Sequence, residues 1–202
     1  PAIAGGAQAL QIMTEAPEST WKYGNPYGVP TLLGLTRAVQ FDDLGDGQRW
    51  GYAKPIMLAG QHGYMLHEHA YKLAAEVGMV IVQIGGSAFR IGLGGGTASS
   101  QMGGDVSEDL DFASVQRGDP GMGLLTRMVY EACVKMRERN PIASAHDQGA
   151  AGPLNVLTEL VEEMGGIINI RKIHVGDTSM SVLEIWGAEY QERYGILVWA
   201  NR

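Results

Sequence analysis

The sequence contains a single cysteine, Cys133, among its 202 residues. An internal disulfide is therefore excluded, as is a zinc site built from several cysteines. Long hydrophobic runs are missing as well, because the longest, at 79–84 and 196–200, fall far short of the ~20 apolar residues that a membrane-spanning helix needs. No secretory signal segment is visible. These absences predict a protein without a membrane segment in a reducing compartment, which we expect to be the cytoplasm.

Charged side chains are also sparse. They make up 18 % of the residues, and the formal net charge is −7. An acidic chain does not present the broad positive field that attracts nucleic acid or anionic membranes, so neither is expected as a partner. Hydrophobic residues make up 45 %, which is enough for a packed core.

Glycine is abundant by contrast, with 29 residues, roughly twice the average usage. A cluster at 85–100 follows the most apolar strand candidate, and a strand entering such a loop is a typical setting for phosphate binding. The standard motifs are absent: no Gly-Lys-Ser/Thr occurs, and Thr97 replaces the third glycine of a dinucleotide fingerprint that starts at Gly92. The cluster carries Arg90, whose guanidinium can bind a phosphate or carboxylate, or form an ordinary surface salt bridge.

Hydrophobic periodicity predicts strands and helices in alternation. Strands are expected at 56–59, 79–84, 142–145, 167–170, 173–175 and 194–200. Helices are expected from Pro120 to the Asn140-Pro141 break, with an inward apolar face that includes Leu125 and Val129, and at 153–164. Residues 14–20 are expected to be loop after a weak helical start. The interleaving predicts an α+β fold, a mixed sheet flanked by helices.

One segment, 142–152, combines a strand, an aspartate and a helix start. Its apolar residues lead into His146 and Asp147, and glycines precede the helix expected from Pro153. Backbone N–H groups at a helix start attract anions, and Mg²⁺ is usually held by one or two carboxylates together with phosphates. Asp147 is therefore a candidate Mg²⁺ ligand at nucleotide phosphates, or else only a cap of the helix. His146 either contacts the ligand or is held by hydrogen bonds.

Further candidates lie outside this segment. Glu184 stands between apolar neighbours, so its carboxylate is paired, metal-bound or turned outward, and Ser181 is a possible helix cap before it. Glu189 and Gln191 precede the last strand, where a solvated turn is the ordinary expectation. Gln116 precedes the helix at Pro120 and either faces a ligand or belongs to a cap.

Several blocks together resemble phosphoribosylformylglycinamidine synthases, the ATP-dependent amidotransferases of purine biosynthesis. These blocks lie at 54–57, 90–100, 110–120, 146–152 and 183–194, in the order of the family. The resemblance runs from about Asn25 to the end and is closer to the long multidomain form. It implies a fragment of the synthetase core. Residues 1–70 would be the tail of an N-terminal domain, and residues 71–202 most of a C-terminal domain like that of aminoimidazole ribonucleotide synthetase.

The resemblance also implies the chemistry. The full-length enzyme would be a ligase that uses ATP and glutamine-derived ammonia to convert formylglycinamide ribonucleotide into the amidine, with ADP as a product. By motif, Asp147 and Glu184 would bind Mg²⁺ and His146 would adjoin the nucleotide. Contacts to the substrate are expected from Gln116, Glu189, Gln191 and Arg90.

Some expectations limit this interpretation. Ala188 stands where the long form has an asparagine ligand, so one metal ligand of the family is missing. The partners would be the remaining synthetase domains and the glutaminase domain, and the fragment alone is expected to be inactive. The metal site could serve the reacting ATP or an auxiliary nucleotide. The alternative to a ligase fragment is a non-catalytic nucleotide-binding or structural module.

Overall fold

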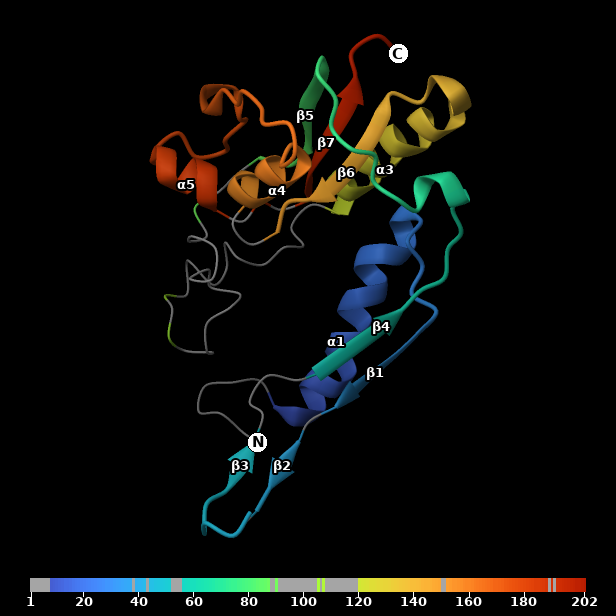
Figure 1. Cartoon of the computed structure of the whole chain (residues 1–202). Helices are drawn as coiled ribbons and strands as arrows, with labels where there is room; N and C mark the ends of the chain where they lie inside the picture. The colour runs from blue at the N-terminus through green and yellow to red at the C-terminus, as the bar shows by residue number, and fades with distance from the viewer. Residues whose placement is uncertain are drawn as a thin grey trace. The chain divides into compact units, whose positions relative to one another are not determined.

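The computed structural model describes residues 8–37, 39–42, 44–51, 56–87, 90, 105, 107, 120–149, 152–188, 190 and 192–202. The chain divides into two compact units, Pro1–Tyr64 and Met65–Arg202, and each is described by itself (Figure 1). The assignment of residues 1–70 to the tail of one domain and of 71–202 to most of another stays a prediction.

The first unit contains helix α1 (Ala9–Gly24), which packs against two antiparallel strands, β1 (Leu33–Arg37) and β4 (Ile56–Gly60). The 3₁₀ helix η1 (Asn25–Tyr27) follows α1, and the short strands β2 (Gln40–Phe41) and β3 (Trp50–Gly51) form a second antiparallel pair. The loop predicted for 14–20 is wrong, because α1 continues through Pro17. The hydroxyls of Thr14, Ser19 and Thr20 donate to carbonyl groups one turn earlier, so these polar side chains are satisfied within the helix.

The second unit is built on a three-stranded sheet in the order β5-β7-β6 (Figure 1). Strands β5 (Met79–Gly85) and β6 (Ile142–Asp147) both pair with β7 (Arg193–Trp199), so the last strand of the chain lies in the middle. These three strands confirm the sequence prediction. The sheet is antiparallel at each described pairing rather than mixed, because β5 and β6 run in the same direction but are separated by β7.

Helices α3 (Pro120–Lys135) and α4 (Gly152–Leu160) cover opposite faces of this sheet. A Cβ atom on Gly195 of β7 would lie 2.9 to 3.1 Å from the side chains of three α4 residues, Val156, Leu157 and Leu160. Alternate residues of a strand face opposite sides, so Tyr194 points to the other face. There its ring meets Tyr130 of α3 edge to face, with the centroids 5.7 Å apart. The α+β class is thereby confirmed.

The remaining elements are short: the 3₁₀ helices η2 (His67–His69), η4 (Arg137–Arg139) and η5 (Ile170–Lys172), and helix α5 (Val182–Gly187). The strands expected at 167–170 and 173–175 are wrong: no strand forms in either range, and η5 lies between them, with the Asn169 side chain accepting the N–H of Arg171 at its start. Among the described residues, no helix combines the length and apolar composition needed to cross a membrane.

The predicted inward face of α3 is also wrong. Leu125 is 57 % exposed and Val129 42 %, whereas Thr126 is buried. Hydrophobic spacing identified an apolar stripe, but the side of α3 that faces the sheet is the one with Thr126 and Tyr130. The main core of the second unit lies on the other face, where α4 packs on β7; its members are Val156, Leu157, Leu160, Val161 and Leu197.

Candidate functional site

The loop after β6 and the segment after α5 meet at Gly152. This residue has a φ of 47°, a conformation that favours glycine, and a Cβ atom here would overlap the carbonyl oxygen of Ala188. The N–H of Gln148 also donates to the carbonyl of Arg193 at 2.8 Å. Two segments that are remote in the sequence, around 147–152 and 184–193, are therefore adjacent through their backbones.

His146 and Asp147 form the end of β6. The Nδ1 atom of His146 lies 2.8 Å from the carbonyl oxygen of Asp147, and Nε2 lies 3.3 Å from Oε2 of Glu159 on α4. The Nζ atom of Lys72 donates to the other Glu159 oxygen at 3.2 Å. The hydrogen bond from Lys72 and the nearby His146 hold the pKa of the Glu159 carboxyl below its usual range. Both ring nitrogens of His146 thus face oxygen atoms that fix its orientation.

Asp147 borders a shallow pocket of about 390 Å³. Its side chain is 74 % exposed, and Tyr130, Tyr194 and Lys72 stand around it. Burial raises the pKa of both tyrosines, and the negative charge of Asp147 raises it further. The phenols therefore stay neutral near pH 7, and the carboxylate of Asp147 is accessible to a cation from solvent.

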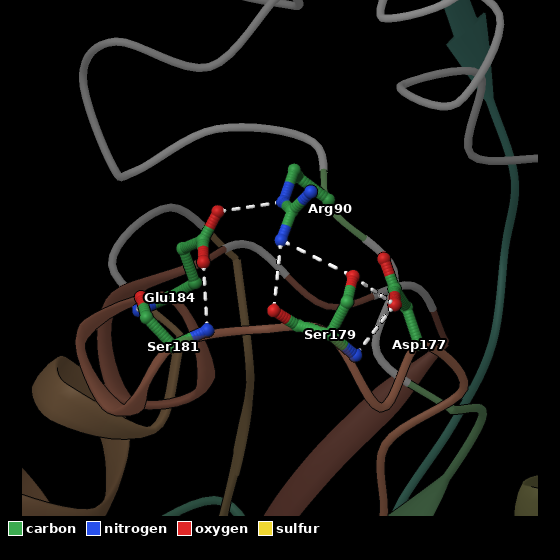
Figure 2. A network of polar contacts seen from close by, with 5 residues as sticks. All are labelled: Arg90, Asp177, Ser179, Ser181 and Glu184. Carbon is green, nitrogen blue, oxygen red and sulfur yellow. Dashed lines mark hydrogen bonds and ion pairs between the residues drawn. The ribbon is translucent and has the colours of Figure 1, made fainter.

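Glu184 is held in the first turn of α5 from two sides (Figure 2). Ser181 and Glu184 form a capping box: Ser181 Oγ accepts the Glu184 N–H at 3.3 Å, and the Ser181 N–H donates to Glu184 Oε2 at 2.8 Å. The other oxygen, Oε1, accepts from Nε of Arg90 at 2.7 Å. The Ser181 hydrogen bonds and then Arg90 lower the pKa of the Glu184 carboxyl.

Arg90 lies between Glu184 and a second acidic group (Figure 2). Its Nη2 atom donates to the carbonyl of Ser179 at 3.0 Å, and the N–H and hydroxyl of Ser179 donate to Asp177 Oδ1 at 2.8 and 2.6 Å. Of the two roles open to Arg90 from the sequence, the structure has the ion pair. The pair links Arg90 to α5.

Asp147 and Glu184 are not brought into contact by any interaction of the described residues. Asp147 lies with Tyr194 on the α3 side, whereas Glu184 belongs to α5, which packs against α4. Over the described part of the chain, no group of three His, Cys, Asp or Glu side chains could hold a metal ion. Asp147 offers exposed oxygens, and both oxygens of Glu184 are engaged. Their shared metal site therefore stays a prediction.

Three predicted substrate contacts, Gln116, Glu189 and Gln191, lie outside the described residues. Sequence reasoning missed Lys72, Tyr130 and Glu159, which surround His146 and Asp147. Lys72 and Glu159 are 87 positions apart, so no local pattern could have paired them. Ala188 is buried, with 1 % of its surface exposed, and supplies no ligand atom from its side chain.

Comparison with known proteins places this arrangement in a family. Residues 76–201 match the family described as AIR synthase related protein, C-terminal domain. Over 96 % of its length the chain is 48 % identical to the probable phosphoribosylformylglycinamidine synthase, chloroplastic/mitochondrial, of Arabidopsis thaliana, of which it covers 14 %.

Two solved structures from Thermotoga maritima share the fold. PurL complexed with FGAR matches with a TM-score of 0.58 and 26 % identity, over 90 % of this chain and 28 % of that one. PurL complexed with ADP matches with a TM-score of 0.53 and 25 % identity, over 90 % of this chain and 26 % of that one. The chain thus corresponds to a segment of much longer synthases, and since the family match covers most of its residues, it belongs to the AIR synthase related proteins.

Proposed function

We propose that the chain is the Mg²⁺- and nucleotide-binding part of a phosphoribosylformylglycinamidine synthase. The complete enzyme would be a ligase of purine biosynthesis that uses ATP and glutamine-derived ammonia to convert formylglycinamide ribonucleotide into the amidine. The 48 % identity to the plant synthase, extending over 96 % of the chain, carries this proposal. The neighbours solved with FGAR and with ADP support the two ligand classes.

The rest of the enzyme lies outside this sequence. The chain covers 14 % of the plant relative, so we propose that further synthetase domains and a glutaminase domain complete the reaction and that the chain alone is inactive. We also propose a cytoplasmic location for this protein, although the plant relative is named as chloroplastic/mitochondrial.

Asp147 is the proposed primary metal ligand. Its carboxylate is 74 % exposed and stands just before the N-terminal turn of α4, where backbone N–H groups favour anions. Carboxylate and phosphate oxygens are the ligands that Mg²⁺ prefers, and the bound ion would neutralise phosphate charge. His146, held by Glu159 and by the Asp147 carbonyl, would present its ring to the nucleotide beside the ion.

Glu184 and Arg90 have a conditional role in this proposal. Glu184 can offer Oε1 to a metal ion only if that oxygen leaves Arg90. Arg90, once released, would be available to a substrate phosphate or carboxylate. We therefore propose Glu184 as a secondary ligand and keep Gln116, Glu189 and Gln191 as proposed substrate contacts.

A second candidate function is a non-catalytic nucleotide site that only stabilises the fold. The observation that favours it is the full engagement of Glu184 by protein atoms, which leaves Asp147 as the accessible carboxylate of the pair. In that case the nucleotide would brace the loop at 147–152 without reacting.

Thermal unfolding with Mg-ADP, compared with Mg²⁺ alone, tests the site. At a hundredfold excess over Kd, a bound ligand stabilises the folded state by about 2.7 kcal/mol. We expect this gain for the chain and its loss in Asp147→Asn. The matched control is Glu163→Gln, which changes an exposed carboxylate beyond α4 and should keep the gain. A gain that persists in Asp147→Asn would reject Asp147 as the ligand.

Turnover of the full-length enzyme separates the two functions. Asp147→Asn in that enzyme should lower kcat if the nucleotide reacts at this site. Turnover that stays unchanged while Mg-ADP binding is lost would favour the stabilising site over the catalytic one.

A further inference from the structure

Arg193 is a buried cation whose charge is not matched by an acidic side chain among the described residues. It is 4 % exposed. Its Nε donates to the carbonyl of Gly86 at 2.7 Å and its Nη2 to the carbonyl of His174 at 2.8 Å. The guanidinium also lies over the ring of Tyr190, 4.4 Å from the centroid. The third nitrogen, Nη1, is buried and has no hydrogen-bond partner.

Gln83 adds a second unpartnered donor on the same face of the sheet. Gln83 is paired with Gly195 of β7, and paired residues face the same side of a sheet. Arg193 is two residues from Gly195 on the same strand, so its side chain faces that side as well. Both side chains therefore point to the α4 side. The Nε2 atom of Gln83 is buried without a hydrogen-bond partner. Leaving a buried donor unsatisfied costs about 1–3 kcal/mol, and more when the group is charged. Two such donors on neighbouring strands therefore point to an acceptor that the described protein atoms do not supply.

Both donors line one groove of about 940 Å³ over β5. Its walls are apolar at Ile81 of β5 and at Met164 and Ile168 beyond α4, whereas Leu157 and Leu197, each 2 % exposed, belong to the packed core. Lys172 and His174 line it as well, and burial lowers the pKa of Arg193 to about 10. Glu76, the acidic residue of the lining, lies beyond Met79, at the opposite end of β5 from Gly85 and Arg193. The groove thus has a donor-rich cationic end and an apolar body.

We propose that this groove binds a small molecule with an oxyanion head, a phosphate or carboxylate, and an apolar body. The head accepts hydrogen bonds from Arg193 Nη1 and Gln83 Nε2 and balances the buried guanidinium charge, while the body lies against Ile81 and Ile168, which are only partly buried. The groove is separate from the pocket beside Asp147, since Arg193 and Gln83 line the former and not the latter. The proposal therefore does not depend on the proposed Mg²⁺-nucleotide site.

Titration of the 202-residue chain with inorganic phosphate in metal-free buffer, at constant ionic strength kept with chloride, tests the head group. The side-chain N–H signals of Gln83 and Arg193 should shift together in ¹H–¹⁵N NMR spectra. Gln83→Met keeps the length of the side chain and removes its amide, whose Nε2 has no partner in the protein, so the variant should fold and bind phosphate at least about tenfold more weakly. Lys135→Met, an exposed cation on α3, should bind as the wild type does.

Phenyl phosphate tests the apolar body. Burial of its ring should make it bind about tenfold tighter than inorganic phosphate. Signals of Gln83 and Arg193 that do not respond to either probe would overturn the proposal and leave the groove to a polypeptide segment. Equal phosphate affinity of Gln83→Met and the wild type would also overturn it, because the anion would then be bound elsewhere.

Discussion

The Nε atom of Arg90 lies 2.7 Å from Oε1 of Glu184, a residue 94 positions further along the chain. The same carboxylate closes the capping box of α5 with its other oxygen. The side chain of Glu184 therefore both closes the cap of α5 and holds Arg90 by an ion pair. A metal ion that binds Glu184 has to compete with Arg90 for Oε1, so removal of Arg90 is expected to strengthen metal binding.

Arg90→Met should raise the affinity for Mg-ADP if Glu184 is a metal ligand. The substitution frees Oε1 of Glu184, so the ion no longer has to displace a guanidinium. Calorimetric titration of Mg-ADP into the variant and into Lys135→Met measures this. A fall in affinity confined to Arg90→Met would instead assign Arg90 to the nucleotide phosphates.

Acid should weaken the α5 region. The Ser181 hydrogen bonds and Arg90 lower the pKa of Glu184 below its unfolded value of ~4.3. A carboxyl whose folded pKa is depressed stabilises the fold fully above the unfolded pKa, and this contribution is lost as the pH falls through the folded pKa. Asp177, with its pKa lowered by Ser179, acts in the same direction. NMR titration of the Glu184 carboxyl should give a midpoint below 4.3, and Arg90→Met should raise it.

Alkali should destabilise the second unit between about pH 10 and pH 12. Burial raises the pKa of Tyr190 to about 12, and that of Tyr194 is raised as well. The folded state then retains protons that the unfolded state releases near pH ~10, so the stability falls as the pH rises through this window. A pH titration followed by phenolate absorbance should show that some of the eight tyrosines ionise at a higher pH than the others. The Tyr190→Phe variant should have one fewer of these high-pKa tyrosines. Titration of all eight near pH ~10 in the folded protein would contradict this.

Gly152→Ala should destabilise the second unit by about 1–3 kcal/mol or more. The new Cβ would overlap the carbonyl oxygen of Ala188, and the φ of 47° disfavours a side chain. Gly149→Ala is the matched control three residues earlier, because nothing lies within 4 Å of its Cβ position. Urea unfolding should leave the control within about 0.5 kcal/mol of the wild type or slightly above it. Equal stability of the two variants would show that residue 152 does not pack against Ala188.

Local signals in the sequence were enough for the elements that carry the site. The continuous apolarity of β5, the periodicity of α4 and the Ser181–Glu184 spacing each depend on neighbouring residues only. All three predictions are confirmed: β5, α4 and the cap of α5. The loop at 14–20 failed because Pro17 reads as a helix breaker, although α1 passes through it.

Tertiary relationships were beyond the sequence. The helical spacing of Leu125 and Val129 identified an apolar side of α3. The side that actually faces the sheet is set by the contact between the rings of Tyr130 and Tyr194, which are far apart in the sequence. Likewise, Asp147 and His146 were identified by their position after a strand, whereas Glu159 and Lys72 reach His146 from distant segments. The metal role of Asp147 and Glu184 rests on the family resemblance and stays a prediction.

The central place of β7 also constrains how the second unit acquires its fold during synthesis. β5 and β6 emerge from the ribosome long before their common neighbour, and neither has its sheet partner until residues 193–199 follow. Strand pairing across such sequence separations is slow, and apolar strands that are exposed before they pair are prone to associate with other chains. A translating ribosome therefore carries β5, with its Val-Ile-Val core, as an unpaired strand for more than a hundred residues of elongation, and this segment is where a chaperone would have most to protect.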